Sequence, residues 1–240
     1  MSNSDSKHIF RFKQFSLTDH NCGMKIGTDG VLLGAIAANI QSQKVLDIGT
    51  GCGLIGLMVA QKQNAIIDCV EIDNRAYSDA KENIENSPWS NKFRLFKTSF
   101  QEFAKLTKKK YDLIVCNPPF FHNSLKPYSN QRNTARHSDS LSFCDLITGV
   151  CKIISSDGKF LLIFPSEQQN DVSNILINNG LFVNEKWNIR PNPDKEVHRI
   201  IICGSKVKTD SFIINEIAIE NGLRHQYSDE YKNLTCDYCI

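Results

Sequence analysis

The stretch that decides the fold is Lys44-Val45-Leu46-Asp47-Ile48-Gly49-Thr50-Gly51-Cys52-Gly53. Its first five residues form a mostly apolar run with the length of a buried strand. Three glycines at alternate positions then turn the chain, because glycine adopts positive φ without steric cost and lets a ligand approach the backbone. The apolar residues 54–60 follow and predict a helix. The stretch therefore predicts a strand, a turn open to a ligand, and a helix.

The same alternation of strand and helix continues toward the C-terminus. Further strands are predicted at 65–70, 93–96, 111–116, 159–164, 181–190 and 197–204, and helices at 76–86, 100–106, 141–153 and 166–178. This alternation predicts an α/β protein with a doubly wound, mostly parallel sheet. The last two strands are joined directly by residues 191–195, which predicts an antiparallel hairpin at the sheet edge. The run 211–217 could add one more edge strand.

The N-terminal side carries a shorter pattern. Residues 10–15 alternate apolar and polar side chains, which predicts an edge strand or a short hairpin arm. Thr28 or Asp29 is predicted to cap a helix over residues 31–38, and a helix N-terminus can hold a carboxylate or phosphate. We expect two parts: an N-terminal extension or hairpin over 1–27, and a single domain over 28–240.

Composition sets wide limits on function. The chain has 240 residues, 41% of them apolar, and a net charge of +2, which is too mild to indicate a nucleic-acid partner by itself. Nine cysteines, several of them in apolar runs, predict a reduced cytoplasmic protein without disulfides. Cys236 and Cys239 form a lone CxxC, which we interpret as part of a tail. We expect no metal site, no membrane segment or signal peptide, and a monomer.

A second motif, Asn117-Pro118-Pro119-Phe120, follows the strand 111–116. The two prolines end the strand and fix the backbone, because each locks φ and removes an amide donor. An amide oxygen, backbone carbonyl groups and a flat ring are thus held together, which suits a planar amine. An ordinary strand-ending turn is the alternative.

The glycine turn alone leaves the cofactor open. Residues 51–56 fit G-x-G-x-x-G, and Glu71 ends the next strand, so a nicotinamide dinucleotide and an oxidoreductase are possible. No Lys-Ser/Thr pair follows, which excludes a P-loop. The carboxylate of Asp47 would repel a pyrophosphate but could accept a bond from an amino-bearing ligand. The edge hairpin and the motif at Asn117 also have no evident task in hydride transfer.

The loop from Asp47 to Gly53, Glu71 and the Asn-Pro-Pro-Phe motif together resemble class I S-adenosylmethionine-dependent methyltransferases that methylate amines. The resemblance narrows with the segments 12–15, 24–34, 134–137 and 227–231. With these, nearly the whole chain resembles the bacterial tRNA adenine-N6 methyltransferases that modify adenine 37 of a valine tRNA. The resemblance implies a Rossmann-like fold with a mostly parallel seven-stranded sheet and an antiparallel edge hairpin.

The resemblance also implies a cofactor site for S-adenosylmethionine. Its expected residues are Thr28, Asp47, Gly49, Gly51, Gly53, Glu71, Ser99 and Asn117. Asp47 and the glycine backbone would hold the methionine end, and Glu71 would bind the ribose hydroxyl groups. Ser99 stands where the family often has an acid that contacts the adenine, so that contact would differ here.

The implied substrate is tRNA. Asn117, Pro118, Pro119 and Phe120 would form the catalytic motif, with Phe120 stacking on the adenine. The other expected substrate contacts are Lys13, Arg132, Arg136 and His137, and the lysines 108–110 are further candidates. Three alternatives remain: a guanine N2 in rRNA or a protein glutamine as the amine, an NAD-dependent oxidoreductase, and an RNA-binding protein without catalysis.

Overall fold

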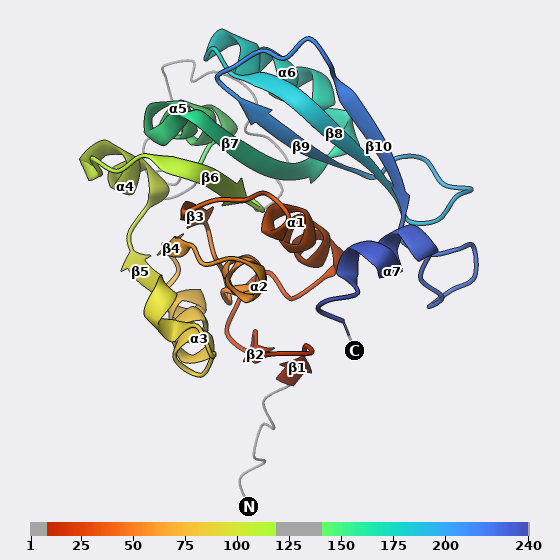
Figure 1. The fold of residues 1–240 in the computed structure, drawn as a ribbon, viewed down its shortest axis with the longest axis horizontal. Coiled ribbons are helices and arrows are strands. Elements are labelled where there is room, and N and C mark those ends of the chain that lie inside the picture. The colour runs from red at the N-terminus through yellow and green to blue at the C-terminus, as the bar shows by residue number, and fades with distance from the viewer. Residues whose placement is uncertain (1–8, 119–140, 240) are drawn as a thin grey trace, which may run out of the picture.

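The structure, a computed structural model, describes residues 9–118 and 141–239. Its centre is a sheet of eight strands in the order β10-β8-β9-β7-β6-β3-β4-β5 (Figure 1). The strands are β3 (Lys44–Ile48), β4 (Ile66–Glu71), β5 (Phe93–Lys97), β6 (Tyr111–Cys116), β7 (Ile154–Pro165), β8 (Phe182–Arg190), β9 (Arg199–Ser205) and β10 (Ile213–Ala218). The sheet is parallel from β7 to β5, as predicted.

The edge of the sheet differs in detail from the prediction. Strands β8 and β9 do form an antiparallel pair, but β9 lies inside the sheet, between β7 and β8. The outermost strand is β10, which confirms the further edge strand considered at 211–217; it runs parallel to β8 and gives the sheet eight strands instead of the seven implied by the resemblance. The predicted hairpin is therefore one strand away from the edge.

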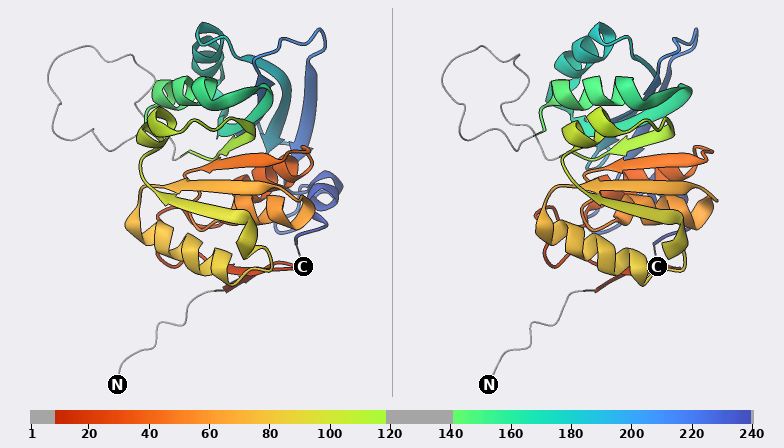
Figure 2. Two further views of the ribbon diagram at one scale, coloured as in Figure 1. Left: turned by 60° about the vertical axis from the view of Figure 1, so that its left-hand side comes forward. Right: turned by 90° about the vertical axis from the view of Figure 1, so that its left-hand side faces the viewer.

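Helices cover both faces of the sheet (Figure 2). They are α1 (Thr28–Ala38), α2 (Leu54–Lys62), α3 (Asn74–Glu85), α4 (Phe100–Leu106), α5 (Phe143–Ile153), α6 (Gln169–Asn178) and α7 (Asp229–Thr235), with short 3-10 turns at Ser90–Lys92 and Ser166–Gln168. One apolar cluster joins α1, α2, α3 and α7 to one face of the sheet. A second joins α4, α5 and α6 to the other face.

The two clusters explain why the central strands are almost continuously apolar. Successive side chains of a strand point to opposite faces. In β3, Val45 belongs to the first cluster and Leu46 to the second; in β6, Leu113 and Ile114 divide in the same way. A sheet buried on both faces thus needs apolar residues at both positions.

The N-terminal and C-terminal segments meet on the α1–α2 side. Strands β1 (Ile9–Arg11) and β2 (Ser16–Thr18) form a separate antiparallel hairpin, so the alternative of an edge strand in the main sheet is wrong. The segment after α7 is not a loose tail: Tyr238 is fully buried, and its hydroxyl group donates to the Met58 carbonyl oxygen at 3.2 Å. Its own carbonyl oxygen accepts from the Lys13 N–H group at 2.9 Å. The division at residues 27 and 28 stays a prediction.

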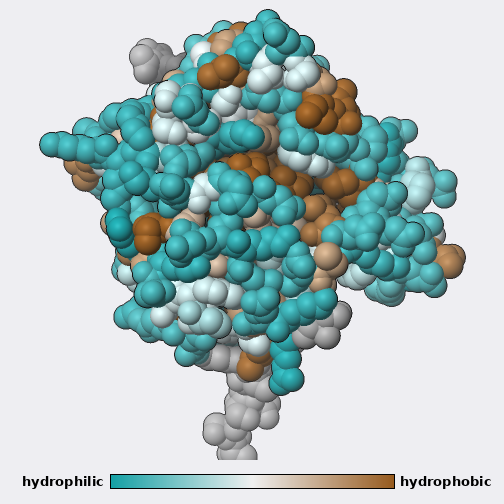
Figure 3. Space-filling model, in the orientation of Figure 1, coloured by the Kyte–Doolittle hydropathy of each residue, from teal (hydrophilic) through white to brown (hydrophobic). Residues whose placement is uncertain are grey.

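Figure 3 shows apolar surface gathered over α1 and the neighbouring strands. A hollow of about 550 Å³ lies between the C-terminal part of α1, α7 and the amino ends of β6 and β7. Its wall includes Ile36, Trp187 and Leu234. None of the predicted site residues belongs to this wall. The opposite edge of the sheet, where the parallel strands end, is the edge at which open α/β sheets bind ligands.

Candidate functional site

A cleft of about 1230 Å³ opens at the carboxyl ends of β3, β4 and β6. Ligand pockets usually measure about 300–1,000 Å³, so this cleft has room for a cofactor and part of a substrate. Residues 21–30 form one wall, and the ends of β8 and β9 another. The predicted site residues that line the cleft together are Thr28, Gly49, Gly51, Glu71, Ser99 and Asn117.

The glycine turn exposes its backbone to this cleft. Gly49, Gly51 and Gly53 all have positive φ, at 65°, 57° and 87°. A Cβ atom added at Gly49 or Gly51 would meet nothing within 4 Å, so these two glycines face open space. At Gly53 a Cβ atom would lie 3.7 Å from Ile84 of α3, which places this glycine against the protein instead. Gly53 accordingly is not part of the cleft wall.

The side chain of Glu71 is held by two backbone N–H groups. One carboxylate oxygen accepts from the Gly51 N–H group and the other from the Asp73 N–H group, both at 2.9 Å. The side chain is buried, and its orientation is fixed by these two bonds. A carboxylate has about four lone-pair sites, so each oxygen can still accept a further hydrogen bond from a ligand hydroxyl group.

Asp47 lies beneath the turn and not in the cleft wall. Its Oδ2 atom accepts from the Thr50 hydroxyl group at 2.6 Å and from the Gly56 N–H group at 3.2 Å. Its Oδ1 atom is buried and has no hydrogen-bond partner among the described residues. Burial raises the pKa of Asp47 to about 6, against the lowering effect of the bonds from Thr50 and Gly56. Asp47 thus braces the glycine turn from beneath, and its second oxygen keeps unused capacity to accept a hydrogen bond.

Two predicted residues lie at helix starts. Thr28 is the first residue of α1, and the N-cap is Gly27 with no side-chain cap, so the prediction that Thr28 or Asp29 caps the helix is wrong. Asp29 instead accepts from Arg199 of β9 at 2.9 Å. Ser99 is the N-cap of α4, and its hydroxyl oxygen accepts from the Glu102 N–H group at 3.2 Å. Both helix starts face the cleft.

Asn117 follows the last residue of β6 and is itself followed by the buried Pro118. Its Nδ2 group donates to the sulfur of Met24 at 3.6 Å. Its Oδ1 atom is buried and has no hydrogen-bond partner among the described residues. Asn117 thus lines the cleft and carries an amide oxygen whose capacity to accept a hydrogen bond is unused by the described residues.

Two of the lysines considered as RNA contacts do not line the cleft. The Lys13 ammonium group donates to the Cys236 carbonyl oxygen at 2.5 Å, which ties it to the C-terminal segment. Lys109 pairs with the buried Asp68 at 2.5 Å and so serves the sheet. Pro119, Phe120, Arg132, Arg136 and His137 lie outside the described residues.

The structure adds residues that sequence reasoning missed. Cys22, Met24 and Cys52 line the cleft beside the glycine turn, and Arg190, His198 and Arg199 line its far end. The residues around Met24 contributed to the family resemblance, but their composition gave no sign of a contact with Asn117. The contribution of β8 and β9 depends on the strand order, which alternation alone does not specify. Within residues 9–118 and 141–239 we find no group of acidic, histidine or cysteine side chains placed to hold a metal ion.

Comparison with known proteins places the chain among methyltransferases. Residues 23–140 match the model of the methyltransferase small domain. A tRNA1(Val) (adenine(37)-N6)-methyltransferase from Parabacteroides distasonis is 39% identical over 231 residues, which cover 96% of this chain and 97% of the relative. An enzyme of the same name from Trichodesmium erythraeum is 41% identical over 234 residues, with coverage of 96% and 97%.

Solved structures confirm the fold. A predicted O-methyltransferase from Agrobacterium tumefaciens superposes with a TM-score of 0.67 at 17% identity, covering 88% of this chain and 96% of that one. A methylase of a ribosomal protein from Lactobacillus delbrueckii subsp. bulgaricus gives 0.52 at 19% identity, with coverage of 73% and 76%. The Rossmann-like methyltransferase fold expected from the sequence is thus confirmed.

Proposed function

The chain belongs to the family of the tRNA1(Val) (adenine(37)-N6)-methyltransferases, and we propose that it methylates the N6 amine of adenine 37 in a valine tRNA. The methyl donor is S-adenosylmethionine. The observation that carries the proposal is the buried Oδ1 atom of Asn117, which lacks a partner among the described residues and lies in the same cleft as the glycine turn. An acceptor in that place is what a planar amine requires.

The polar groups of the cleft match those of the cofactor. Glu71 would accept from the two ribose hydroxyl groups, because its carboxylate is already oriented and keeps spare lone pairs. The backbone at Gly49 and Gly51 would lie against the methionine end, since nothing fills the space beside these glycines. Asp47 would act from beneath, through its bonds to Thr50 and Gly56 and through its free Oδ1 atom. The bound cofactor supplies an electrophilic methyl group on a sulfonium ion.

The catalytic motif would orient the adenine. Asn117 Oδ1 and the Pro118 carbonyl oxygen accept the two N6 hydrogens, which turns the nitrogen lone pair toward the methyl group. Phe120, which lies outside the described residues, would stack on the base. Catalysis then rests mainly on orientation for an in-line displacement. The proton released from nitrogen after transfer passes to water.

The RNA must bring one base into the cleft. Moving a base out of its stack costs a few kcal/mol, and an anticodon loop offers a base that is easily displaced. Arg132, Arg136 and His137 would contact the RNA. Lys13 remains a predicted RNA contact, although its ammonium group is bound to the Cys236 carbonyl oxygen.

A tRNA substrate agrees with a cytoplasmic enzyme, and we propose a monomer as its active form. None of the helices in the described ranges is long and apolar enough to cross a lipid bilayer. Size-exclusion chromatography with light scattering at enzyme concentrations used for turnover tests the monomer.

The deciding experiment offers the enzyme a choice of amines. Unmodified valine tRNA, rRNA and a release factor are each incubated with the enzyme and cofactor labelled in the methyl group. We expect label only in the tRNA, and nucleoside mass spectrometry should identify N6-methyladenosine at position 37. Label in the rRNA or the protein alone would reject the proposed substrate. Stabilisation of the enzyme by NAD but not by S-adenosylhomocysteine would reject the cofactor.

A further inference from the structure

The two ends of the Asn117 amide group have different surroundings. Its Nδ2 group donates to the Met24 sulfur at 3.6 Å, whereas its Oδ1 atom is buried without a partner among the described residues. An amide group that turns by half a circle about its last bond exchanges these two ends. Whatever holds the nitrogen therefore decides where the oxygen points.

Met24 lies on an irregular segment, residues 19–27, which we call the cleft strap. The strap forms one wall of the cleft between β2 and α1. Having no strand or helix of its own, it depends on side-chain bonds for its position. Two hydrogen bonds brace it from within: Asp19 Oδ2 accepts from the Ile26 N–H group at 2.8 Å, and the Lys25 ammonium group donates to the Asp19 carbonyl oxygen at 2.7 Å.

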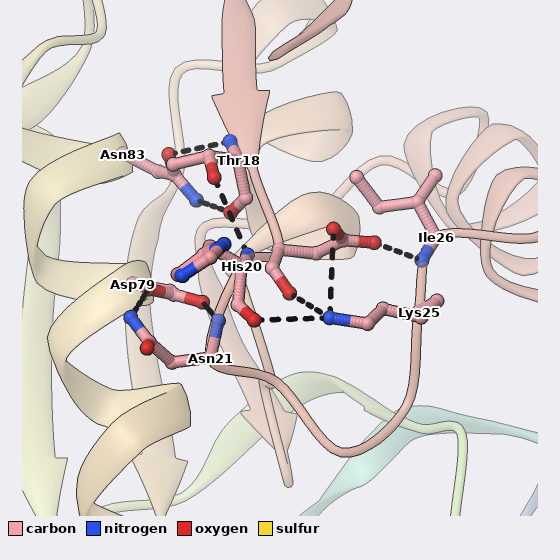
Figure 4. A network of polar contacts seen from close by, with 8 residues as sticks. Thr18, His20, Asn21, Lys25, Ile26, Asp79 and Asn83 are labelled. Carbon is pink, nitrogen blue, oxygen red and sulfur yellow. Dashed lines mark hydrogen bonds and ion pairs between the residues drawn. The ribbon is translucent and has the colours of Figure 1, made fainter. Parts of the chain in front are cut away.

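Helix α3 fixes the strap from outside. Figure 4 shows Asp79 reaching the strap, and Asn83 reaching Thr18 of β2 just before it, from one face of that helix. The two carboxylate oxygens of Asp79 accept from the backbone and the side-chain amide of Asn21, each at 2.7 Å. Asn83 accepts from the Thr18 N–H group at 3.0 Å and donates to the Cys52 carbonyl oxygen at 2.8 Å, so it also joins the strap region to the glycine turn. Met24 is thereby carried on a braced segment.

We propose that Met24 is a positioning residue that aims the Asn117 amide oxygen at the substrate amine. This inference rests on the proposed function of Asn117. In the opposite orientation Oδ1 would face the Met24 sulfur, and two acceptors repel each other. That orientation would also present N–H groups to the N6 hydrogens, which places donors against donors. Met24 thus disfavours the unproductive form of the amide before the substrate arrives.

The test compares two substitutions of similar length. Met24→Leu removes the acceptor and keeps the apolar bulk, whereas Met24→Gln restores an acceptor oxygen. A thioether is a weak acceptor, so we expect Met24→Leu to lower kcat by roughly two- to tenfold with the KM for cofactor unchanged. Met24→Gln should recover most of the loss. Equal losses in both variants, or no loss in Met24→Leu, would overturn the proposal.

A double-mutant cycle supplies the matched control. In an Asn117→Ala background, Met24→Leu should cause no further fall in the residual rate, because its effect passes through the Asn117 amide. A full additional fall would show that Met24 acts on the substrate or cofactor directly and would contradict the inference.

A measurement without substrate separates this inference from the proposed function. In enzyme labelled at the methionine methyl groups, nuclear Overhauser effects should join the Met24 methyl group to the Asn117 Nδ2 protons. The Met58 methyl group, buried under α1, provides the negative control. If the contact is seen but no tRNA is methylated, the proposed function fails and the positioning contact stands. If the contact is missing from an active enzyme, the inference fails alone.

Discussion

Asn117 is the residue on which the chemistry depends. Replacing it with alanine removes the free amide acceptor without filling the cleft. We expect Asn117→Ala to lower kcat roughly a hundredfold or more, because orientation of the amine is lost. The rise in melting temperature on addition of S-adenosylhomocysteine should equal that of the wild type. The exposed Asn170 of α6 gives a control, Asn170→Ala, that should change neither. Unimpaired turnover in Asn117→Ala would refute the mechanism.

The raised pKa of Asp47 predicts how the stability of the fold depends on pH. Burial raises its pKa from 3.8 to about 6 in the folded protein. A raised pKa means that the folded state binds the proton more tightly than the unfolded state. The resulting stabilisation is fully present below the unfolded value and is lost as pH rises through about 6.

Asp47→Asn should remove this dependence. As pH rises from about 4 to about 7, the wild type should lose on the order of 3 kcal/mol of its free energy of unfolding relative to the variant. Urea unfolding of both proteins without cofactor measures it. A constant difference across this range would show that the Asp47 carboxyl group titrates normally.

The glycine turn gives a prediction at the scale of an element. Gly51 has a φ of 57° and faces open space in the cleft. Gly180, which follows α6, has a φ of 68° and also has nothing within 4 Å. Alanine at either position should cost about 1–2 kcal/mol of stability, because an L-residue is strained there.

Only Gly51→Ala should also weaken the binding of S-adenosylhomocysteine, since its methyl group would enter the cofactor space. Isothermal titration calorimetry and thermal melting of both variants separate strain from lost binding. Equal cofactor affinity in the two variants would mean that the turn does not contact the cofactor.

Lys109, one of the three lysines 108–110, stabilises a buried carboxylate of the sheet. Its ammonium group pairs with Asp68 of β4 at 2.5 Å, and Asp68 also accepts from the Tyr111 hydroxyl group at 2.7 Å. Lys109→Ala should lower stability by about 1–2 kcal/mol, because Asp68 is almost fully buried. The exposed Lys108 is the matched control, and Lys108→Ala should be neutral. A raised KM for tRNA with unchanged stability in Lys109→Ala would favour an RNA contact instead.

The elements that sequence predicted well are those with a strong local pattern. Local residue types are enough to predict the turn at Gly49, Gly51 and Gly53 and the apolar strands around it. The position of β9 depends on contacts between distant segments, which alternation does not encode. The strand expected at 159–164 begins earlier, at Ile154, and within it Gly158 lets the backbone of Tyr111 approach. The contact between Met24 and Asn117 joins residues 93 positions apart, so no spacing rule could reveal it.

At the scale of the whole molecule, Tyr238 joins the two ends of the described chain. It is fully buried, and it bonds to Met58 of α2 and to the backbone of Lys13. Tyr238→Ala should cost about 3–5 kcal/mol, because a large cavity results and the Met58 carbonyl oxygen loses its bond from the tyrosine hydroxyl group. For a protein of this size that is a fall in melting temperature on the order of 10 °C.

A control for Tyr238→Ala is Lys232→Ala, at an exposed position of α7, which should melt like the wild type. Calorimetry of the three proteins tests the prediction. If Tyr238→Ala melted normally, the C-terminal segment would not contribute to the stability of the domain.

The pairing of Lys13 with the C-terminal segment spans 223 positions of the chain. At a synthesis rate of about 5–20 residues per second, that interval takes roughly ten seconds to most of a minute on the ribosome. During this time the N-terminal hairpin has emerged and Asn83 of α3 can already bind Thr18, but the C-terminal residues that bind Lys13 have not been made. We therefore expect the hairpin to be only partly protected from proteolysis until the residues around Cys236 have been made, so that the first strands of the nascent protein are among the last to be fully fixed.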